Sequence, residues 1–323
     1  MNGWRIAASP RYAQRGVSAT PQPTRRGGSL DQLLRRVPRG CAMSLQQNGI
    51  PPARSWWPGF CAPPRRRLTR GFGRARGIAY RRGSEPMVPT TQQARAASAP
   101  STDDAFDVVV TRPVLGREVA RAAAALLSDA ERQRASRFLF DRDRDRFIVG
   151  RARLRQLLAA RLGTRPESVE LVYGAHGKPA LARRFADSDL RFNVSHCDDV
   201  TLYAFSCGRE IGVDVEAVRV LGDADDIAGR FFSHRENQAY RALERRDRPL
   251  GFFQCWTRKE AFIKALGDGL SYPLDRFDVS LAPGEPAEIL RVEAMPGACC
   301  GWRMESLSPA PGFVAAVVIG DRE

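Results

Sequence analysis

The sequence contains very little lysine. Of its 51 basic residues only three are lysines, Lys178, Lys259 and Lys264, and the other 48 are arginines. Two of the three lie in the stretch WTRKEAFIKA at 256–265. Lysine carries a compact ammonium that can sit on a phosphate as a point charge, which a planar guanidinium does not reproduce. We therefore expect the few lysines of this chain to occupy positions where an arginine could not perform the same function.

Paired cysteines and long apolar runs are also missing. The seven cysteines are odd in number and form no CxxC pair, and two of them, Cys299 and Cys300, are adjacent. This pattern disfavours a disulfide framework or a zinc site and fits a reducing compartment, so we expect a cytoplasmic protein. The late apolar run at 313–319 is seven residues long, whereas a membrane helix needs about 20. It predicts a buried strand and no membrane partner.

Acidic residues are scarce only at the start of the chain. Residues 1–86 contain 17 arginines and two acidic residues, Asp31 and Glu85, so this segment accounts for the entire net charge of +15. Residues 87–323 contain 34 basic and 34 acidic side chains. The basic charge is therefore no sign of a nucleic-acid partner for the folded part.

The same first segment holds ten of the 22 prolines and 11 of the 28 glycines. We expect a disordered leader over 1–104, because such a composition cannot bury enough apolar area to offset its ordering entropy. An arginine-rich, acid-poor leader resembles an organellar transit peptide. The alternative, which we favour, is an upstream start, with Met87 opening the real protein.

Apolar periodicity after residue 105 predicts an α+β fold made of two lobes, 105–216 and 217–323. Ser128 followed by Glu131 is a capping-box signal for a helix start. Helices are expected at 128–139, 141–162, 222–232, 233–246 and 252–267. Strands are expected at 107–114, 169–173, 191–195, 201–206, 211–216, 275–281, 288–294, 301–307 and 313–319.

The segment IGVDVE at 211–216 places two carboxylates two residues apart in a predicted strand. Because side chains alternate between the two faces of a strand, Ile211, Val213 and Val215 should face a core while Asp214 and Glu216 share the open face. Like charges this close raise each other's pKa unless a cation neutralises them, and Mg²⁺ prefers such oxygen ligands. The alternative is an ordinary edge strand with a solvated acidic face.

In the segment WTRKEAFIKA at 256–265, Trp256, Glu260 and Lys264 are spaced four residues apart and should lie along one side of a helix. A Glu–Lys pair at this spacing is also the commonest surface salt bridge on helices. The scarcity of lysine favours a phosphate contact for Lys264. Gly267 and Gly269 should end this helix and allow close approach of the backbone.

Two further segments carry groups suited to phosphate. HGKPAL at 176–181 places Lys178 and Pro179 in a turn, and FNVSH at 192–196 ends a strand with Ser195 and His196. A hydroxyl and an imidazole can both hold phosphate oxygens. His176 is expected to be incidental.

The remaining reactive side chains give weaker signals. His234 is expected to belong to a helix start. Cys197 has no plausible base partner beyond the adjacent His196, so a nucleophilic Cys–His pair is a minor alternative.

Taken together, GKP, FNVSH, GVDVE and WTRKEAFIKA–GDGL resemble, in order and spacing, the 4′-phosphopantetheinyl transferases of the large, two-lobed kind typified by the surfactin-synthetase activator. The resemblance spans about residues 105–320. It implies a pseudo-dimer of two similar α+β lobes with the site in the cleft between them, acting as a monomer. It also implies Mg²⁺-dependent transfer of phosphopantetheine from coenzyme A to a serine of an apo acyl or peptidyl carrier protein, releasing adenosine 3′,5′-bisphosphate.

The resemblance also implies roles for individual residues. Asp214, Glu216 and Glu260 correspond to Mg²⁺ ligands, and Glu260 also resembles the family's candidate base for the carrier serine. Lys264 corresponds to the lysine on the pyrophosphate and His196 to a histidine on a coenzyme phosphate.

The coenzyme site would include further positions. Lys178 and Pro179 match the adenine-binding turn, and Arg134 and Arg137 fall in the basic stretch that meets the 3′-phosphate. The chain departs from the family at Glu131, a position that is often basic in the part that meets the 3′-phosphate.

Two other functions share some of these residues. A Mg²⁺-dependent phosphohydrolase would use the same carboxylates and lysines but release free phosphate. A noncatalytic binding protein could act through the basic leader, although the neutral charge after Met87 disfavours it.

Overall fold

The computed structural model of the chain describes residues 90–91, 106–174, 176–267, 272–293 and 301–321, which belong to the unit formed by residues 36–323. The expectations for the leader lie outside these residues, except that Thr90–Thr91 form a short strand, β1. The expected helix-ending Gly269 also lies outside them.

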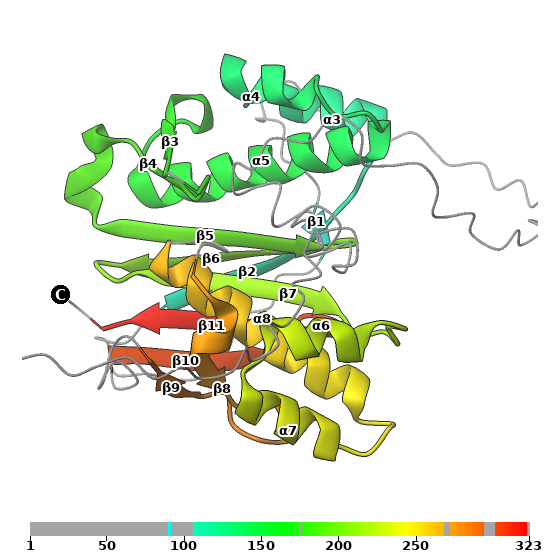
Figure 1. Cartoon of the computed structure of the whole chain (residues 1–323). Helices are drawn as coiled ribbons and strands as arrows, with labels where there is room; N and C mark the ends of the chain where they lie inside the picture. Colours follow the sequence, from blue (N-terminus) through cyan, green and yellow to red (C-terminus); the bar gives the residue numbers. More distant parts are fainter. Residues whose placement is uncertain (1–89, 92–105, 175, 268–271, 294–300, 322–323) are drawn as a thin grey trace, which may run out of the picture. The chain divides into compact units, whose positions relative to one another are not determined.

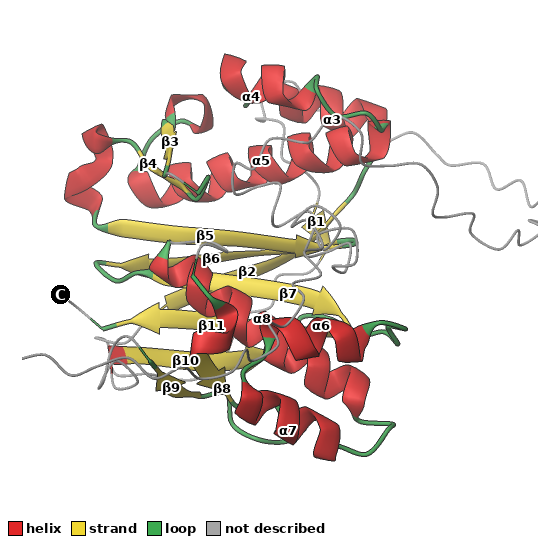
Figure 2. Cartoon of the chain, viewed as in Figure 1, coloured by secondary structure: helices red, strands yellow, loops and turns green. Residues whose placement is uncertain are grey.

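The described residues contain both helices and strands, which confirms the predicted α+β class (Figures 1 and 2). The first half contains β2 (Phe106–Pro113), α3 (Arg117–Ala124), α4 (Asp129–Ala135), α5 (Asp141–Leu162), β3 (Leu171–Tyr173), β4 (Pro179–Leu181), β5 (Leu190–Cys197), β6 (Val200–Cys207) and β7 (Ile211–Ala217). The second half contains α6 (Ala224–Phe231), α7 (His234–Ala242), α8 (Arg248–Leu266), β8 (Phe277–Val279), β9 (Ile289–Val292), β10 (Trp302–Leu307) and β11 (Phe313–Gly320).

The strands of the described residues form four antiparallel sheets, in the orders β1-β2-β6-β5, β10-β11-β7, β3-β4 and β8-β9. Strand β7 therefore pairs with β11 from the end of the chain, with Asp214 opposite Ala316. This register fixes the carboxylate strand within a sheet built mainly from the second half.

The sheet of β2, β5 and β6 has a core on each face. Val109 and Phe205 pack with α5 on one face. Val108 and Leu202 pack on the other face with β7 and β11, as through Val213. Figure 1 shows the result: α3, α4 and α5 lie on one side of this sheet, and β7, β11 and α8 lie on the other. Strand β7 is thereby enclosed between the first sheet and α8.

Local signals explain most helix boundaries. The predicted capping box of Ser128 and Glu131 opens α4, and a second one opens α7. Helix α5 ends at Gly163 and α8 at Gly267, both in the left-handed conformation that glycine favours. Helix α3 was not predicted, because its N-cap is Gly116 and no side chain caps it.

Several predicted boundaries differ from the structure. Helix α8 begins at Arg248 rather than 252, because Pro249 is well suited to the first helical turn. The strand expected at 169–173 is shortened by a 3₁₀ turn, Pro166–Ser168, which precedes it. None of the described helices is both long enough and apolar enough to cross a membrane.

Candidate active site

The two carboxylates of β7 are buried, with Asp214 only 2% exposed and Glu216 only 1%. The expectation of an open acidic face is wrong, because α8 and β5 cover that side of the strand. Gly212 makes this possible: a Cβ added there would lie 3.0 Å from Ala265 Cα and closer still to Ala261 O and Ala265 N. Only a glycine lets β7 and α8 approach this closely.

Three elements meet at Asp214. Lys264 of α8 donates from Nζ to Asp214 Oδ1 at 2.7 Å, and Ser195 of β5 donates from Oγ to the same oxygen at 2.8 Å. Lys264 Nζ also donates to Ser195 Oγ at 3.3 Å and to Val213 O at 3.4 Å. The predicted helix and strand motifs are thus joined by a buried ion pair.

Glu260 lies one helical turn before Lys264 and is also buried. Burial raises its pKa to about 8; Lys264 opposes this rise, while the charges of Asp214 and Glu216 reinforce it. The ionised form of this side chain is therefore disfavoured unless more positive charge comes close to these carboxylates.

The donor set suits a hard cation. Among the residues that the structure describes, no three His, Cys, Asp or Glu side chains are already gathered as closely as a metal needs. Asp214 Oδ2, however, is buried and accepts no hydrogen bond. Mg²⁺ commonly takes only one or two carboxylates and fills its other positions with water and substrate oxygens. Asp214 and Glu216, with Glu260 as neighbour, fit that requirement.

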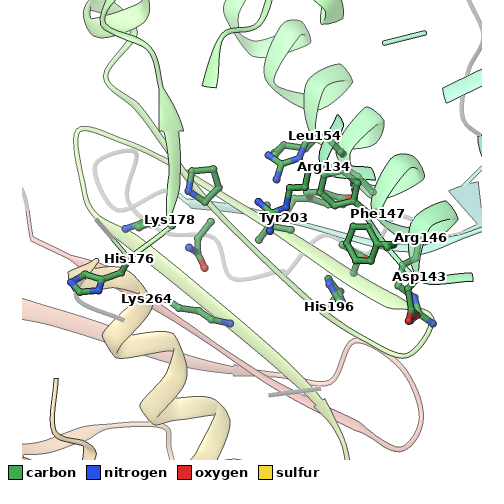
Figure 3. Close-up of a pocket in the computed structure, with 18 of the residues that line it drawn as sticks. Arg134, Asp143, Arg146, Phe147, Leu154, His176, Lys178, His196, Tyr203 and Lys264 are labelled. Carbon is green, nitrogen blue, oxygen red and sulfur yellow. Dashed lines mark hydrogen bonds and ion pairs between the residues drawn. The ribbon is translucent and has the colours of Figure 1, made fainter. Parts of the chain in front are cut away.

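A pocket opens beside this cluster, between α4, α5, the turn at 176–179, strands β5 and β6, and the end of α8 (Figure 3). Lys178 and Lys264 lie on one side of it, while Arg134, Arg146 and His196 lie on the other (Figure 3). Arg151 also lines the pocket, and among the described lining residues the only acidic one is Asp143. Such an excess of positive charge suits a ligand with several negative groups.

Burial lowers the pKa of two side chains that line the pocket. Burial, with the charges of Arg146 and Lys264, lowers the pKa of His196 to about 4, so its imidazole is neutral at physiological pH. Burial also lowers the pKa of Arg146, and its Nε is enclosed without a hydrogen-bond partner. Both groups can donate a hydrogen bond to an anion that enters the pocket.

The pocket gathers five of the predicted coenzyme residues: Arg134, Lys178, Pro179, His196 and Lys264. Arg137 is exposed and does not line it, and Ser195 contacts Asp214 instead. Sequence reasoning missed Arg146, Arg151 and Tyr203, and it dismissed His176, which also lines the pocket. The available signal was that Arg146, Gly150 and Leu154 follow the four-residue spacing of one helix face.

Glu131, the departure from the family pattern, has a structural role. One carboxylate oxygen accepts the Ser128 N–H at 2.9 Å and the Nε–H of Arg155 at 2.7 Å. Both Glu131 and Arg155 are buried. Glu131 therefore anchors α4 to α5 and does not line the pocket.

Lys259 is also structural, because it is fully buried. Its Nζ donates to Leu274 O at 2.6 Å and to Phe277 O at 2.7 Å, and it pairs with Glu236 at 2.8 Å. It ties α7 and the segment around residues 274–277 to α8.

Cys197 is not set up as a nucleophile. Burial, reinforced by the nearby Glu216 carboxylate, raises the pKa of its thiol well above the usual range. Cys197 Sγ lies 3.4 Å from Glu216 Oε2. A neutral thiol in that setting is unreactive.

Comparisons with known proteins agree on one family. The model of the 4′-phosphopantetheinyl transferase superfamily matches residues 210–318, and that of the 4′-phosphopantetheinyl transferase N-terminal region matches residues 116–207. The two matches meet just before β7.

Curated relatives from the same family also match the chain. The 4′-phosphopantetheinyl transferase HetI of Nostoc sp. is 40% identical over 196 residues, which cover 61% of this chain and 79% of the relative. The 4′-phosphopantetheinyl transferase Sfp of Bacillus subtilis is 29% identical over 176 residues, which cover 54% of this chain and 75% of the relative. The human L-aminoadipate-semialdehyde dehydrogenase-phosphopantetheinyl transferase is 30% identical over 169 residues, which cover 50% of this chain and 55% of the relative.

Proposed function

Because the chain belongs to the 4′-phosphopantetheinyl transferase superfamily, we propose that it transfers the phosphopantetheine arm of coenzyme A to a serine of an apo acyl or peptidyl carrier protein. Adenosine 3′,5′-bisphosphate is the second product. The observation that carries this proposal is the basic pocket beside the buried Asp214–Lys264 pair. Coenzyme A has several phosphate groups, which such a pocket would neutralise.

The pocket residues would bind and orient the coenzyme. Arg134, Arg146 and His196 on one side of the pocket would hold phosphate oxygens. Lys264 on the other side would contact the pyrophosphate next to the carboxylates. Holding the reacting phosphorus in one place removes much of the entropic barrier to attack.

Asp214, Glu216 and Glu260 would hold Mg²⁺. When bound, the ion would supply positive charge for the pyrophosphate oxygens. Positive charge near the three carboxylates also favours the ionised form of Glu260, which burial otherwise disfavours.

The transfer itself needs a base and charge stabilisation. Ionised Glu260 would accept the proton of the carrier serine hydroxyl while the serine oxygen forms a bond to the phosphorus. The bond between that phosphorus and the bridging oxygen of the pyrophosphate breaks, and the oxygen leaves with the bisphosphate nucleotide. Lys264 would stabilise the negative charge that develops on this leaving group.

We also propose that residues 105–216 and 217–323 form the two lobes of a pseudo-dimer with the site between them, which acts as a monomer without nucleic-acid or membrane partners. The close approach of β7 to α8 supports the shared site. The described cysteines, Cys197, Cys207 and Cys255, are free thiols, which supports a cytoplasmic location.

The direct test is incubation with coenzyme A, Mg²⁺ and a panel of apo-carrier proteins, read by intact mass. We expect a gain of one phosphopantetheine arm and release of the bisphosphate nucleotide. No gain across a broad panel would refute the transfer, and release of free phosphate would indicate a phosphohydrolase. A chain without residues 1–86 should keep its activity, whereas a binding protein acting through the leader would lose its partner.

A further inference from the structure

Lys178 connects three distant segments of the chain. Its Nζ donates to Glu210 Oε2 at 2.8 Å and to the main-chain oxygen of Ala265 at 3.1 Å. Lys178 lies in the turn between β3 and β4, Glu210 directly precedes β7, and Ala265 lies in the last turn of α8. One ammonium therefore joins the wall of the pocket to both segments that carry the proposed metal ligands.

The contact at Ala265 has a clear physical basis. The last four carbonyls of a helix lack partners within the helix, and a cation near them also interacts favourably with the helix dipole. Helix α8 ends at Gly267, and a Cβ added to Gly267 would lie 3.9 Å from Lys178 Cδ. The stem of Lys178 thus lies along the end of the helix, and its ammonium caps the carbonyl of Ala265.

Glu210 supplies the charge that holds this ammonium. The side chain of Lys178 is 19% exposed and that of Glu210 is 48% exposed. The other oxygen of Glu210 pairs with Arg191 at 3.4 Å. Neither Glu210 nor Arg191 lines the pocket, whereas Lys178 does. Glu210 can therefore affect a bound molecule only through Lys178 or through the position of β7.

We propose that Glu210, Lys178 and the carbonyl of Ala265 form a latch, which rests on the proposed function and makes Glu210 a positioning residue for coenzyme A. The latch fixes the pocket wall at 176–179 against the end of α8. Lys264 directly precedes Ala265, so the same contact sets where the pyrophosphate lysine stands relative to that wall. The latch stays closed when the coenzyme is bound.

The test uses Glu210→Gln in the full chain, because glutamine keeps the size of the side chain and removes its charge. The expected result is a rise of about 3- to 10-fold in the KM for coenzyme A, with kcat changed by less than about 2-fold, since a partly exposed charge pair has a modest effect. Calorimetric binding of coenzyme A should weaken by the same factor. That second readout does not depend on transfer.

A double-variant comparison identifies the route of the effect. Lys178→Met should raise the KM for coenzyme A at least as much as Glu210→Gln does. The double variant should raise this KM no further than Lys178→Met alone. The matched control is Glu170→Gln. It breaks another exposed pair, with Arg184 at 2.9 Å, away from the pocket, and should leave the KM unchanged.

Three results would overturn the latch: an unchanged KM in Glu210→Gln, additive losses in the double variant, or tighter coenzyme binding in Glu210→Gln. The last would show that Lys178 leaves Glu210 to contact the coenzyme. If the wild-type chain transfers no arm, the proposed function fails, while coenzyme binding still decides the latch. If it transfers the arm and Glu210→Gln behaves like wild type, only the latch fails.

Discussion

Replacing Gly212 by alanine tests whether the close approach of β7 to α8 builds the site. The new Cβ would lie 3.0 Å from Ala265 Cα and overlap the main-chain atoms Ala261 O and Ala265 N. Carbon atoms in contact normally lie about 3.5–4.0 Å apart. Because the obstructing atoms belong to the helix backbone, no side-chain rotation relieves the overlap. Helix α8 must move away by about 1 Å or more.

Such a movement reaches the chemistry directly. Lys264 Nζ lies 2.7 Å from Asp214 Oδ1, and a shift on the order of 1 Å takes this pair beyond hydrogen-bond length. Misplacing catalytic groups by that much costs roughly 100-fold in rate, and overpacking a core costs about 1–3 kcal/mol of stability. We therefore expect Gly212→Ala to lower both the transfer rate and the free energy of unfolding by about these amounts.

The assay measures transfer to an apo-carrier protein by intact mass and stability by urea unfolding. Transfer is measured well below the variant's own unfolding temperature, so that loss of folded protein is not counted as loss of rate. The matched control is Gly229→Ala in α6, where an added Cβ meets nothing within 4 Å and should stabilise the helix by about 0.5–1 kcal/mol. A Gly212→Ala variant with wild-type rate and stability would refute the reasoning.

Three further predictions concern single side chains. Glu260→Gln should abolish transfer while coenzyme A still binds by calorimetry, because it removes the proton acceptor; near-normal transfer would exclude Glu260 as the base. Lys259→Met should lower the free energy of unfolding by about 3–5 kcal/mol, because it leaves the Glu236 carboxylate buried without its partner; a loss in urea unfolding below about 1 kcal/mol would contradict this. The pKa of His196 falls from 6.5 unfolded to about 4 folded, so stability should fall by about 2–3 kcal/mol as the pH drops through this range. A His196→Asn variant with the same pH profile would show that His196 is not responsible.

The strongly periodic segments could be predicted from the sequence. Helix α5 begins and ends at the predicted residues because acidic residues start it and Gly163 ends it. Helix α3 could not be predicted, because Gly116 provides no side-chain cap. Its position depends instead on packing against α5, as through the buried Ala120 and Val149.

The site was predictable as residue types but not as an arrangement. The strand alternation correctly separated Asp214 from Val213, yet nothing within 211–216 shows that a helix tens of residues later covers the carboxylates. The arginines of α5 were missed for a related reason. From the sequence, Arg146 and Arg151 look like the solvated face of an amphipathic helix, and only the fold shows that they line the same pocket as the turn at 176–179.

The scarcity of lysine has a practical consequence for chemical probing. All three lysines are among the described residues, and the side chain of Lys259 is fully buried while that of Lys264 is only 6% exposed. Apart from the amino terminus, the most accessible amine is therefore Lys178, at the pocket wall. Acetylation of the native protein, mapped by mass spectrometry, would report the modification of Lys178 with little signal from the other two lysines. The chain thus carries its own single-site reporter of pocket occupancy.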